Sequence, residues 1–174
     1  NGATYTGKKP DENTVYTNLK HVVEYAHKQG FEDSQIILVG RSIGTAVTLK
    51  YAAHHSDFDR IVLISPMTSA KGFIAPLVAK HSIPEDALGK DLLLSYQNLD
   101  RVKKPIFFVH GIEDDLVTFK EHGLALYHQY SEGKKKKDVY PPLWINRAGH
   151  NDYIQKYGQQ RLYNRIKKFI YHPF

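Results

Sequence analysis

The sequence predicts an α/β protein with a mainly parallel sheet, because two periodicities alternate along the chain. Short apolar runs rich in branched residues and bounded by Gly or Pro are typical of buried parallel strands. Stretches with apolar residues three or four positions apart are typical of helices that pack one face against such a sheet. Strands that alternate with helices are joined by right-handed crossovers, so their carboxyl ends meet at one edge, where ligands usually bind.

The first part of the chain predicts two helices and two strands. Residues 12–29 predict a helix that ends before Gly30, because one face carries Val15, Leu19, Val22, Val23 and Ala26. Residues 35–40 form a short branched run that ends in Gly, as a buried strand does. Residues 43–54 predict the next helix, and residues 60–65 predict a strand that Pro66 ends.

The second part is regular only after residue 104. Residues 66–104 are interrupted by Pro76, Pro84 and Gly89, so short helices are expected there. Residues 105–109 and 143–146 predict strands, and residues 118–130 predict the helix between them. The last helix is clearest where four apolar residues share a face, namely Leu162, Ile166, Phe169 and Ile170.

The strand at residues 35–40 is apolar on both faces, which predicts a central position in the sheet. As an open edge it would favour aggregation. We therefore expect residues 1–174 to be the carboxy-terminal part of one domain, with further strands upstream.

The composition excludes several kinds of site. The 174 residues include no Cys, which excludes disulfides, cysteine-bound metals and a thiol nucleophile. No convincing metal-ligand spacing is present, so neither a metal nor a cofactor is expected. No apolar run approaches about 18 residues, so no membrane span is expected. The net charge is +6, and its densest run is Lys134–Lys137. Because no motif that recognises nucleic acid accompanies this run, we expect a solvated loop and no nucleic-acid partner.

A candidate nucleophile follows the first strand. The run Gly40-Arg41-Ser42-Ile43-Gly44 has the G-x-S-x-G pattern between a strand and a helix. We expect a side chain at either Gly to clash with the neighbouring strand or helix. The turn would lift the Ser42 hydroxyl above the sheet, and the helix would direct its amide groups toward the reacting centre. The alternative is a glycine-rich turn whose serine caps the helix.

A serine hydroxyl needs a base, and that base needs an orienting acid. The third strand is followed by His110-Gly111-Ile112-Glu113-Asp114-Asp115, and the fourth by Arg147-Ala148-Gly149-His150-Asn151-Asp152. Each candidate thus follows a different strand, in the order Ser, Asp, His that is typical of α/β-hydrolases. The sequence therefore predicts a catalytic triad of Ser42, Asp114 and His150.

The spacing alone leaves rivals for two of these roles. His110 is a rival base, although we expect it to pack structurally before its glycine turn. Glu113 and Asp115 are rival acids. We expect Asp152 to cap the last helix.

The segments GRSIGTA, HGIEDDLVTFKEHGLALY and PPLWINRAGHNDY together resemble serine hydrolases of the α/β-hydrolase-domain-containing group, in particular subfamily seventeen. The resemblance runs from about residue 4 to about residue 170. It implies an α/β-hydrolase fold with Ser42 as nucleophile, Asp114 as acid and His150 as base, and with the amide of Ile43 as one oxyanion donor. Members are implicated in removing palmitoyl groups, which implies an acylated protein or a lipid-like ester as substrate.

The resemblance also implies segments that this chain lacks. In such proteins an upstream loop supplies the second oxyanion donor, and an amino-terminal lipidated cysteine-rich segment brings the enzyme to the membrane. The implied location is cytoplasmic, at the cytosolic face of membranes, with peripheral attachment through a segment not in this chain. Residues 66–104 lie where such folds carry a lid, so they either line an acyl-chain groove or pack as short helices on the core. A general carboxylesterase or lipase, and an inactive binding module, remain the alternatives.

Overall fold

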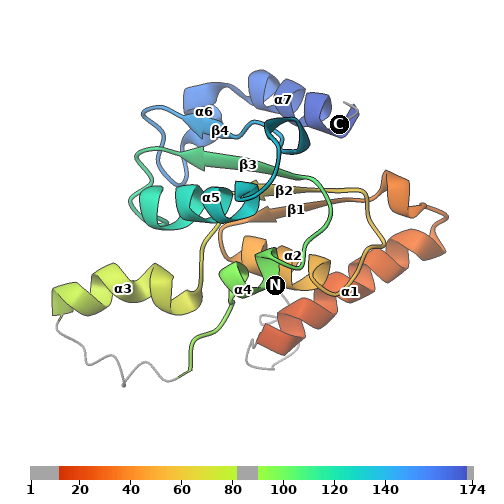
Figure 1. Cartoon of the computed structure of the whole chain (residues 1–174), viewed down its shortest axis with the longest axis horizontal. Coiled ribbons are helices and arrows are strands. Elements are labelled where there is room, and N and C mark those ends of the chain that lie inside the picture. Colours follow the sequence, from red (N-terminus) through yellow and green to blue (C-terminus); the bar gives the residue numbers. More distant parts are fainter. Residues whose placement is uncertain (1–11, 82–89, 172–174) are drawn as a thin grey trace.

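The computed structural model describes residues 12–81 and 90–171 (Figure 1). Its sheet has four strands in the order β1-β2-β3-β4, and each neighbouring pair is parallel. The strands are β1 (Ile37–Arg41), β2 (Arg60–Ile64), β3 (Ile106–Gly111) and β4 (Leu143–Ile145). Their carboxyl ends share one edge, on the left in Figure 1. The α/β class with a parallel sheet is therefore confirmed.

Helices alternate with these strands, close to the positions that the periodicity predicts. They are α1 (Glu12–Lys28), α2 (Ile43–Ala52), α3 (Ala70–His81), α4 (Ser95–Leu99), α5 (Ala125–Ser131), α6 (Tyr153–Tyr157) and α7 (Gln159–Tyr171). Shorter turns occupy η2 (Asp33–Gln35), η4 (Lys120–Leu124) and η5 (Lys136–Asp138). The helix expected at residues 118–130 thus begins as the π-helical turn η4. Gly158, with a φ of 95°, separates α6 from α7.

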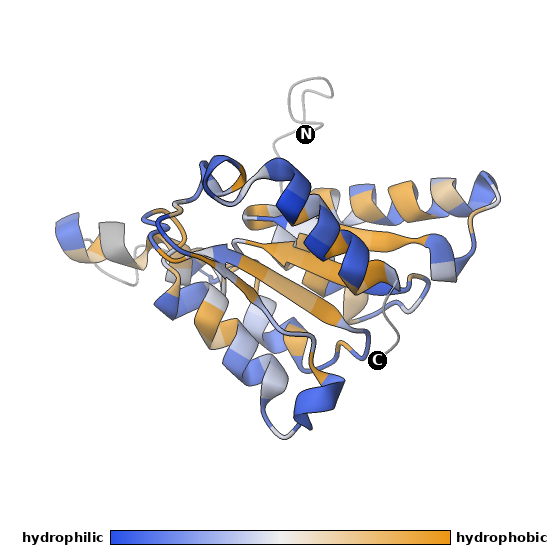
Figure 2. Ribbon diagram, turned by 90° about the horizontal axis from the view of Figure 1, so that it is seen from above, coloured by the Kyte–Doolittle hydropathy of each residue, from blue (hydrophilic) through white to orange (hydrophobic). Residues whose placement is uncertain are grey.

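The sheet separates two hydrophobic cores, because alternate side chains of a strand point to opposite faces. On one face, Ile61, Leu63, Ile106 and Phe108 pack with residues of α1, α2, α4 and α5. On the other face, Val62, Ile64, Phe107 and Val109 pack with residues of α6 and α7. Figure 2 shows the strands as a hydrophobic layer flanked by helices of mixed polarity. The two inner strands β2 and β3 are thus buried on both faces.

Strand β1 lies at the edge of the described sheet with β2 as its neighbour there, and its expected central position depends on strands outside the described residues. Residue Gln35 belongs to the turn η2, and the strand begins only at Ile37. Leu38 is buried, whereas the side chain of Val39 is 59% exposed. An apolar run therefore identified the strand but not its number of neighbours. The expectation of further strands upstream stays a prediction.

The segment at residues 66–104 contains α3 and α4 between β2 and β3. Helix α3 extends away from the body on the side of the strands' carboxyl ends (Figure 1). Helix α4 packs instead on the body, where Ser95 and Leu99 are buried. Residues 82–89, with Pro84 and Gly89, lie outside the described residues. The lid-like role of this segment stays a prediction.

Strand β1 and helix α2 approach closely at Gly40. A Cβ on Gly40 would lie 2.7 Å from Thr48 Oγ1 and 2.8 Å from the backbone of Gly44 and Thr45. A Cβ on Gly44 would meet nothing within 4 Å. The expected clash is therefore confirmed at Gly40 and wrong at Gly44, where the added carbon would enter open space.

The two glycines make a matched pair for a stability test. Gly40→Ala should lower the free energy of unfolding by about 1–3 kcal/mol, because backbone atoms must move apart. Gly44→Ala should leave it unchanged or raise it by up to about 1 kcal/mol, because alanine favours a helix more than glycine does. Urea unfolding followed by circular dichroism measures both, and equal destabilisation by the two variants would contradict the packing described.

Candidate active site

Ser42 lies in the sharp turn between β1 and α2. Its backbone has φ 53° and ψ −126°, a conformation that residues other than glycine rarely adopt. The Ser42 amide donates to Ile64 O at 2.9 Å, which ties the turn to β2. Its carbonyl accepts from the Thr45 hydroxyl at 2.6 Å. Although Ser42 is the N-cap residue of α2, its hydroxyl makes no capping hydrogen bond, so the alternative of a helix-capping serine is wrong.

Asp114 and His150, which are 36 residues apart, meet through a buried hydrogen bond. The distance from His150 Nδ1 to Asp114 Oδ2 is 2.9 Å. Both residues are buried, with relative exposures of 4% and 6%. The other carboxylate oxygen, Oδ1, accepts from the amides of Leu116 at 3.1 Å and Val117 at 2.8 Å. The loop after β3 therefore holds this carboxylate in one orientation.

The protonation of this pair follows from its contacts. Burial opposes the charged form of Asp114, but hydrogen bonds from His110, the Val117 amide and His150 outweigh it and hold the pKa of Asp114 well below its usual range. An ionised carboxylate can only accept, so Nδ1 of His150 carries the hydrogen. The other ring nitrogen, Nε2, is then the basic atom of His150.

Backbone contacts join the loops that follow β3 and β4. The amide of Ile112 donates to Ile145 O at 3.0 Å, and that of Glu113 donates to Ala148 O at 2.9 Å. Gly111 passes so close to Ala148 that a Cβ there would collide with the Ala148 carbonyl. Glycine at this position therefore allows the approach that brings the aspartate and histidine loops together.

Arg41 joins the serine turn to the histidine loop. Its guanidinium donates to His150 O at 2.9 Å and to Asn151 Oδ1 at 2.7 Å. It also lies 5.7 Å from the centre of the Tyr153 ring. These contacts hold the residue next to Ser42 against the backbone of His150. The sequence does not single out Arg41, because the G-x-S-x-G pattern leaves its second position unspecified.

The Ser42 hydroxyl is not joined to the hydrogen-bonded pair of His150 and Asp114. Within residues 12–81 and 90–171, Ser42 Oγ makes no hydrogen bond to His150 or Asp114. Catalytic hydrogen bonds are often long without substrate and tighten when it binds. The structure thus brings Asp114 and His150 into contact, and Arg41, the neighbour of Ser42 in the chain, binds the loop that carries His150.

The rival residues have other surroundings. His110 is 1% exposed, and its Nε2 lies 2.8 Å from Val117 O and 3.3 Å from Asp114 Oδ2, so it packs structurally as expected. Glu113 and Asp115 are exposed, and neither forms a hydrogen bond with His150 in the described part of the chain. Asp152 accepts from the Gly149 amide at 2.7 Å. It precedes α6 without capping it, so the expected helix cap is wrong: the carboxylate closes the preceding turn instead.

A hollow of about 470 Å³ opens beside His150, between the loops after β3 and β4. Its lining includes Leu116, which is 48% exposed, and Asp115 and Asn151. The described residues contain no group of three side chains suited to holding a metal ion. The expectation of no metal or cofactor stays a prediction. Across residues 12–81 and 90–171, no helix has both the length and the apolar character needed to cross a bilayer.

Comparison with known families shows which family this chain belongs to. The sequence profile of the prolyl oligopeptidase family matches residues 5–174. The chain belongs to this family. It is 30% identical over 166 residues to human (Homo sapiens) alpha/beta hydrolase domain-containing protein 17B, covering 93% of this chain and 51% of the relative. It is 31% identical over 167 residues to protein 17C of Xenopus tropicalis, covering 94% and 48%. The chain therefore spans about half the length of the curated relatives it matches, and the resemblance to subfamily seventeen is confirmed.

Solved structures share the fold. A sugar hydrolase from Lactococcus lactis superposes with a TM-score of 0.71 at 14% identity, covering 96% of this chain and 72% of that one. An acylaminoacyl peptidase from Pyrococcus horikoshii gives 0.67 at 18% identity, covering 91% and 27%. These likenesses show the α/β-hydrolase fold.

The ionised Asp114 should make the stability of the fold depend on pH. Its pKa is lower in the folded chain than in the unfolded chain, where it is about 3.9. The charged carboxylate therefore stabilises the fold above about pH 4, and this contribution is lost as the pH falls through the folded pKa. The difference in free energy of unfolding between wild type and Asp114→Asn should accordingly be largest near neutral pH and shrink in acid.

Urea unfolding over a pH series, down to the most acidic pH at which the fold persists, measures this difference. Asp115→Asn is the matched control, because Asp115 is exposed and adjacent in sequence. It should show no comparable loss in acid. A difference for Asp114→Asn that stays constant with pH would contradict the ionised, hydrogen-bonded carboxylate.

Proposed function

We propose that the protein is a serine hydrolase that cleaves acyl thioesters or esters through Ser42, His150 and Asp114, and that its substrates are S-acylated proteins. The observation that carries the proposal is the 2.9 Å hydrogen bond between Asp114 and His150, in a loop that Arg41 ties to the turn of Ser42. The positive φ of Ser42 and its uncapped helix support the same role, because a nucleophilic serine sits on such a strained turn.

The proposed reaction proceeds in two halves. Nε2 of His150 takes the proton of the Ser42 hydroxyl as its oxygen attacks the acyl carbonyl carbon. Asp114 holds the ring in the required tautomer and stabilises the imidazolium. His150 then protonates the leaving thiol or alcohol, which leaves an acyl-Ser42 ester. Water, losing its proton to His150, attacks this ester, releases the fatty acid and restores the serine.

The oxyanion of each tetrahedral intermediate needs hydrogen-bond donors. Ile43 begins α2, and amides of a first helical turn have no partner within the helix. Its amide is the proposed first donor. The second donor is proposed to come from a segment upstream of residue 1. Residues 1–174 would then be the carboxy-terminal part of one α/β-hydrolase domain, in which residues 66–104 act as a lid. Loss of one donor costs roughly 10²–10³ in kcat.

Apolar side chains around the site support a substrate with a hydrocarbon chain. Ile43 follows Ser42 and is 58% exposed, and Leu116, two residues after Asp114, is 48% exposed. Ile112, in the same loop, is 40% exposed. Exposed apolar groups gathered at a site favour apolar ligands. Attachment to the cytosolic face of a membrane, which would bring such substrates near, is proposed to come from a segment outside this chain.

Ser42→Ala should abolish labelling by a fluorophosphonate probe and lower kcat by roughly 10⁴-fold or more, because the attacking oxygen is gone. Ser56→Ala is the matched control, since Ser56 is exposed and precedes the amino end of β2. Gel fluorescence after probe treatment and ester hydrolysis measure the two effects. An unlabelled wild-type protein would instead favour an inactive binding module, and an unchanged rate in Ser42→Ala would remove Ser42 from the mechanism.

The thioester preference has a separate test. Two substrates of equal acyl length are used, one S-acyl and one O-acyl. For each substrate, kcat/KM is divided by the rate of its spontaneous hydrolysis, and the two quotients are compared. The correction removes the intrinsic difference between the leaving groups. We expect the corrected value to be higher for the S-acyl substrate. An equal or higher value for the O-acyl substrate would favour a general carboxylesterase or lipase over a depalmitoylating enzyme.

A further inference from the structure

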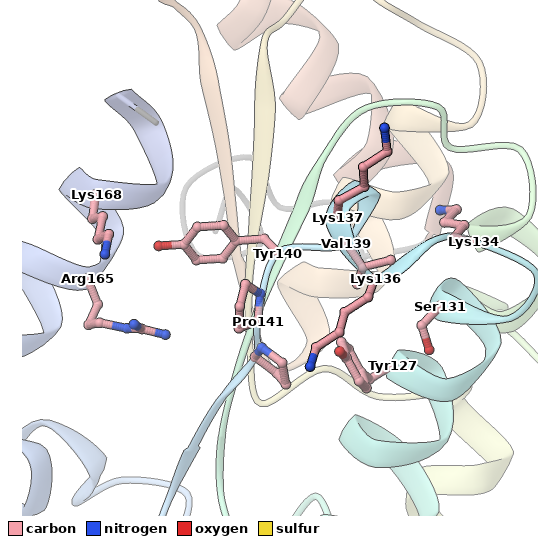
Figure 3. A pocket seen from close by; sticks show the side chains of 11 residues that line it. Tyr127, Ser131, Lys134, Lys136, Lys137, Val139, Tyr140, Pro141, Arg165 and Lys168 are labelled. Atoms are coloured by element: carbon pink, nitrogen blue, oxygen red, sulfur yellow. The ribbon is translucent and has the colours of Figure 1, made fainter. Parts of the chain in front are cut away.

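A cavity of about 760 Å³ lies between α5, the segment at residues 134–142 and α7 (Figure 3). We call it the basic pocket, because its lining contains five cationic side chains: Lys134, Lys136, Lys137, Arg165 and Lys168. None of the described residues that line it is acidic. The lysine run that the sequence predicts as a plain solvated loop is thus one wall of a cavity whose other wall carries two more cations.

The basic pocket lies at the amino ends of the strands, whereas the candidate active site lies at their carboxyl ends. The Tyr140 ring packs against Phe107, near the start of β3, with ring centres 5.1 Å apart. Asp114 and His150, in contrast, follow the carboxyl ends of β3 and β4. A ligand in the basic pocket would therefore leave the serine site open, so the two sites can be tested separately.

The cations of the basic pocket contact aromatic rings but no described carboxylate, and Lys134 Nζ lies 3.4 Å from the centre of the Tyr130 ring. None of the five cations forms an ion pair with a described residue. The Nε atom of Arg165 is buried and has no hydrogen-bond partner among those residues. A buried donor without an acceptor costs free energy, and like charges gathered around one space repel each other. Both costs would be relieved by an anion with several acceptor oxygens.

Two separate elements direct three of these charges, Arg165, Lys168 and Lys136, toward the same space. Figure 3 shows Arg165 and Lys168 projecting from α7 on one side and Lys136 on the other, with Tyr140 and Pro141 between them. The guanidinium of Arg165 lies 5.8 Å from the centre of the Phe107 ring and 5.9 Å from that of Tyr140. These rings limit the orientations that the cation can adopt. A bound anion would bridge α7 and the segment before β4.

The size and charge of the basic pocket indicate the class of ligand. Its volume falls within the roughly 300–1,000 Å³ typical of small-molecule sites, whereas a nucleic acid would need an extended basic surface. The three cations that face the cavity, Arg165, Lys168 and Lys136, would be balanced by about two phosphate groups, since each carries about −1.5 to −2 charges. We propose that the basic pocket binds a compact, multiply phosphorylated group, either a free phosphate ester or the headgroup of a phosphoinositide lipid.

The test compares two double variants of the full chain that lose the same charge. Lys136→Gln with Lys168→Gln alters two residues of the pocket lining. Lys135→Gln with Lys167→Gln alters the neighbouring lysines, which do not line it. All four side chains are exposed, so both variants should fold, as thermal melting checks. Inositol hexakisphosphate is the soluble probe, measured by calorimetry. Phosphatidylcholine vesicles with phosphatidylinositol bisphosphate are the lipid probe, measured by co-sedimentation against phosphatidylserine vesicles of equal charge.

The pocket variant should bind the recognised probe about tenfold more weakly, and the control variant should lose less than about twofold, because only the pocket lysines converge on one ligand. If only the soluble probe binds more weakly to the pocket variant, the ligand is a free phosphate ester. If only the lipid probe does so, the ligand is a phosphoinositide headgroup. Equal losses in both variants would overturn the proposal in favour of a general charge effect. Absence of binding to either probe by the wild-type protein would also overturn it. Hydrolysis of a small soluble ester should be the same in both variants.

Discussion

The register between β3 and β4 determines where the buried carboxylate and imidazole meet. Val109 pairs with Leu143 and Gly111 with Ile145, so the two strands end level at one edge of the sheet. The loops that follow can then exchange backbone hydrogen bonds, provided that nothing larger than glycine stands at residue 111. A slip of one residue would turn the side chains of β4 to the opposite face and separate the loops.

The charge of Asp114 depends on this arrangement in turn. A carboxylate buried to 4% exposure would be neutral unless several donors compensated the loss of water. The two amides of its own loop supply part of this compensation, and His110 and His150 supply the rest. The rival acids stand in the same loop but face solvent. The fold around the loop therefore determines that Asp114, and not a neighbouring acid, contacts His150. The spacing of acidic residues in the sequence does not predict this.

Sequence patterns predicted the features that depend on residues close together in the chain. The alternation of periods gave the parallel sheet, and a strand followed by G-x-S-x-G gave the strained turn at Ser42. Whether strands outside the described residues flank β1 depends on more than its apolar run, because such a run does not state how many strands lie beside it. The openness around Gly44 and the contact from Arg41 to His150 O also depend on segments distant in the sequence. The same holds for the basic pocket, where α7 joins a lysine run that ends 22 residues before the helix begins.

Arg165 shows how the packing of α7 and the basic pocket are connected. Leu162, Ile166 and Phe169 pack on the core from α7, and Arg165, next to Ile166, lies at the border of this apolar face. An arginine at such a position has its stem among hydrophobic groups and gives up part of its hydration. Contact with aromatic rings returns some of that free energy, but the buried Nε has no acceptor among the residues that the structure describes. An anionic ligand in the basic pocket would supply the acceptor that this buried Nε lacks.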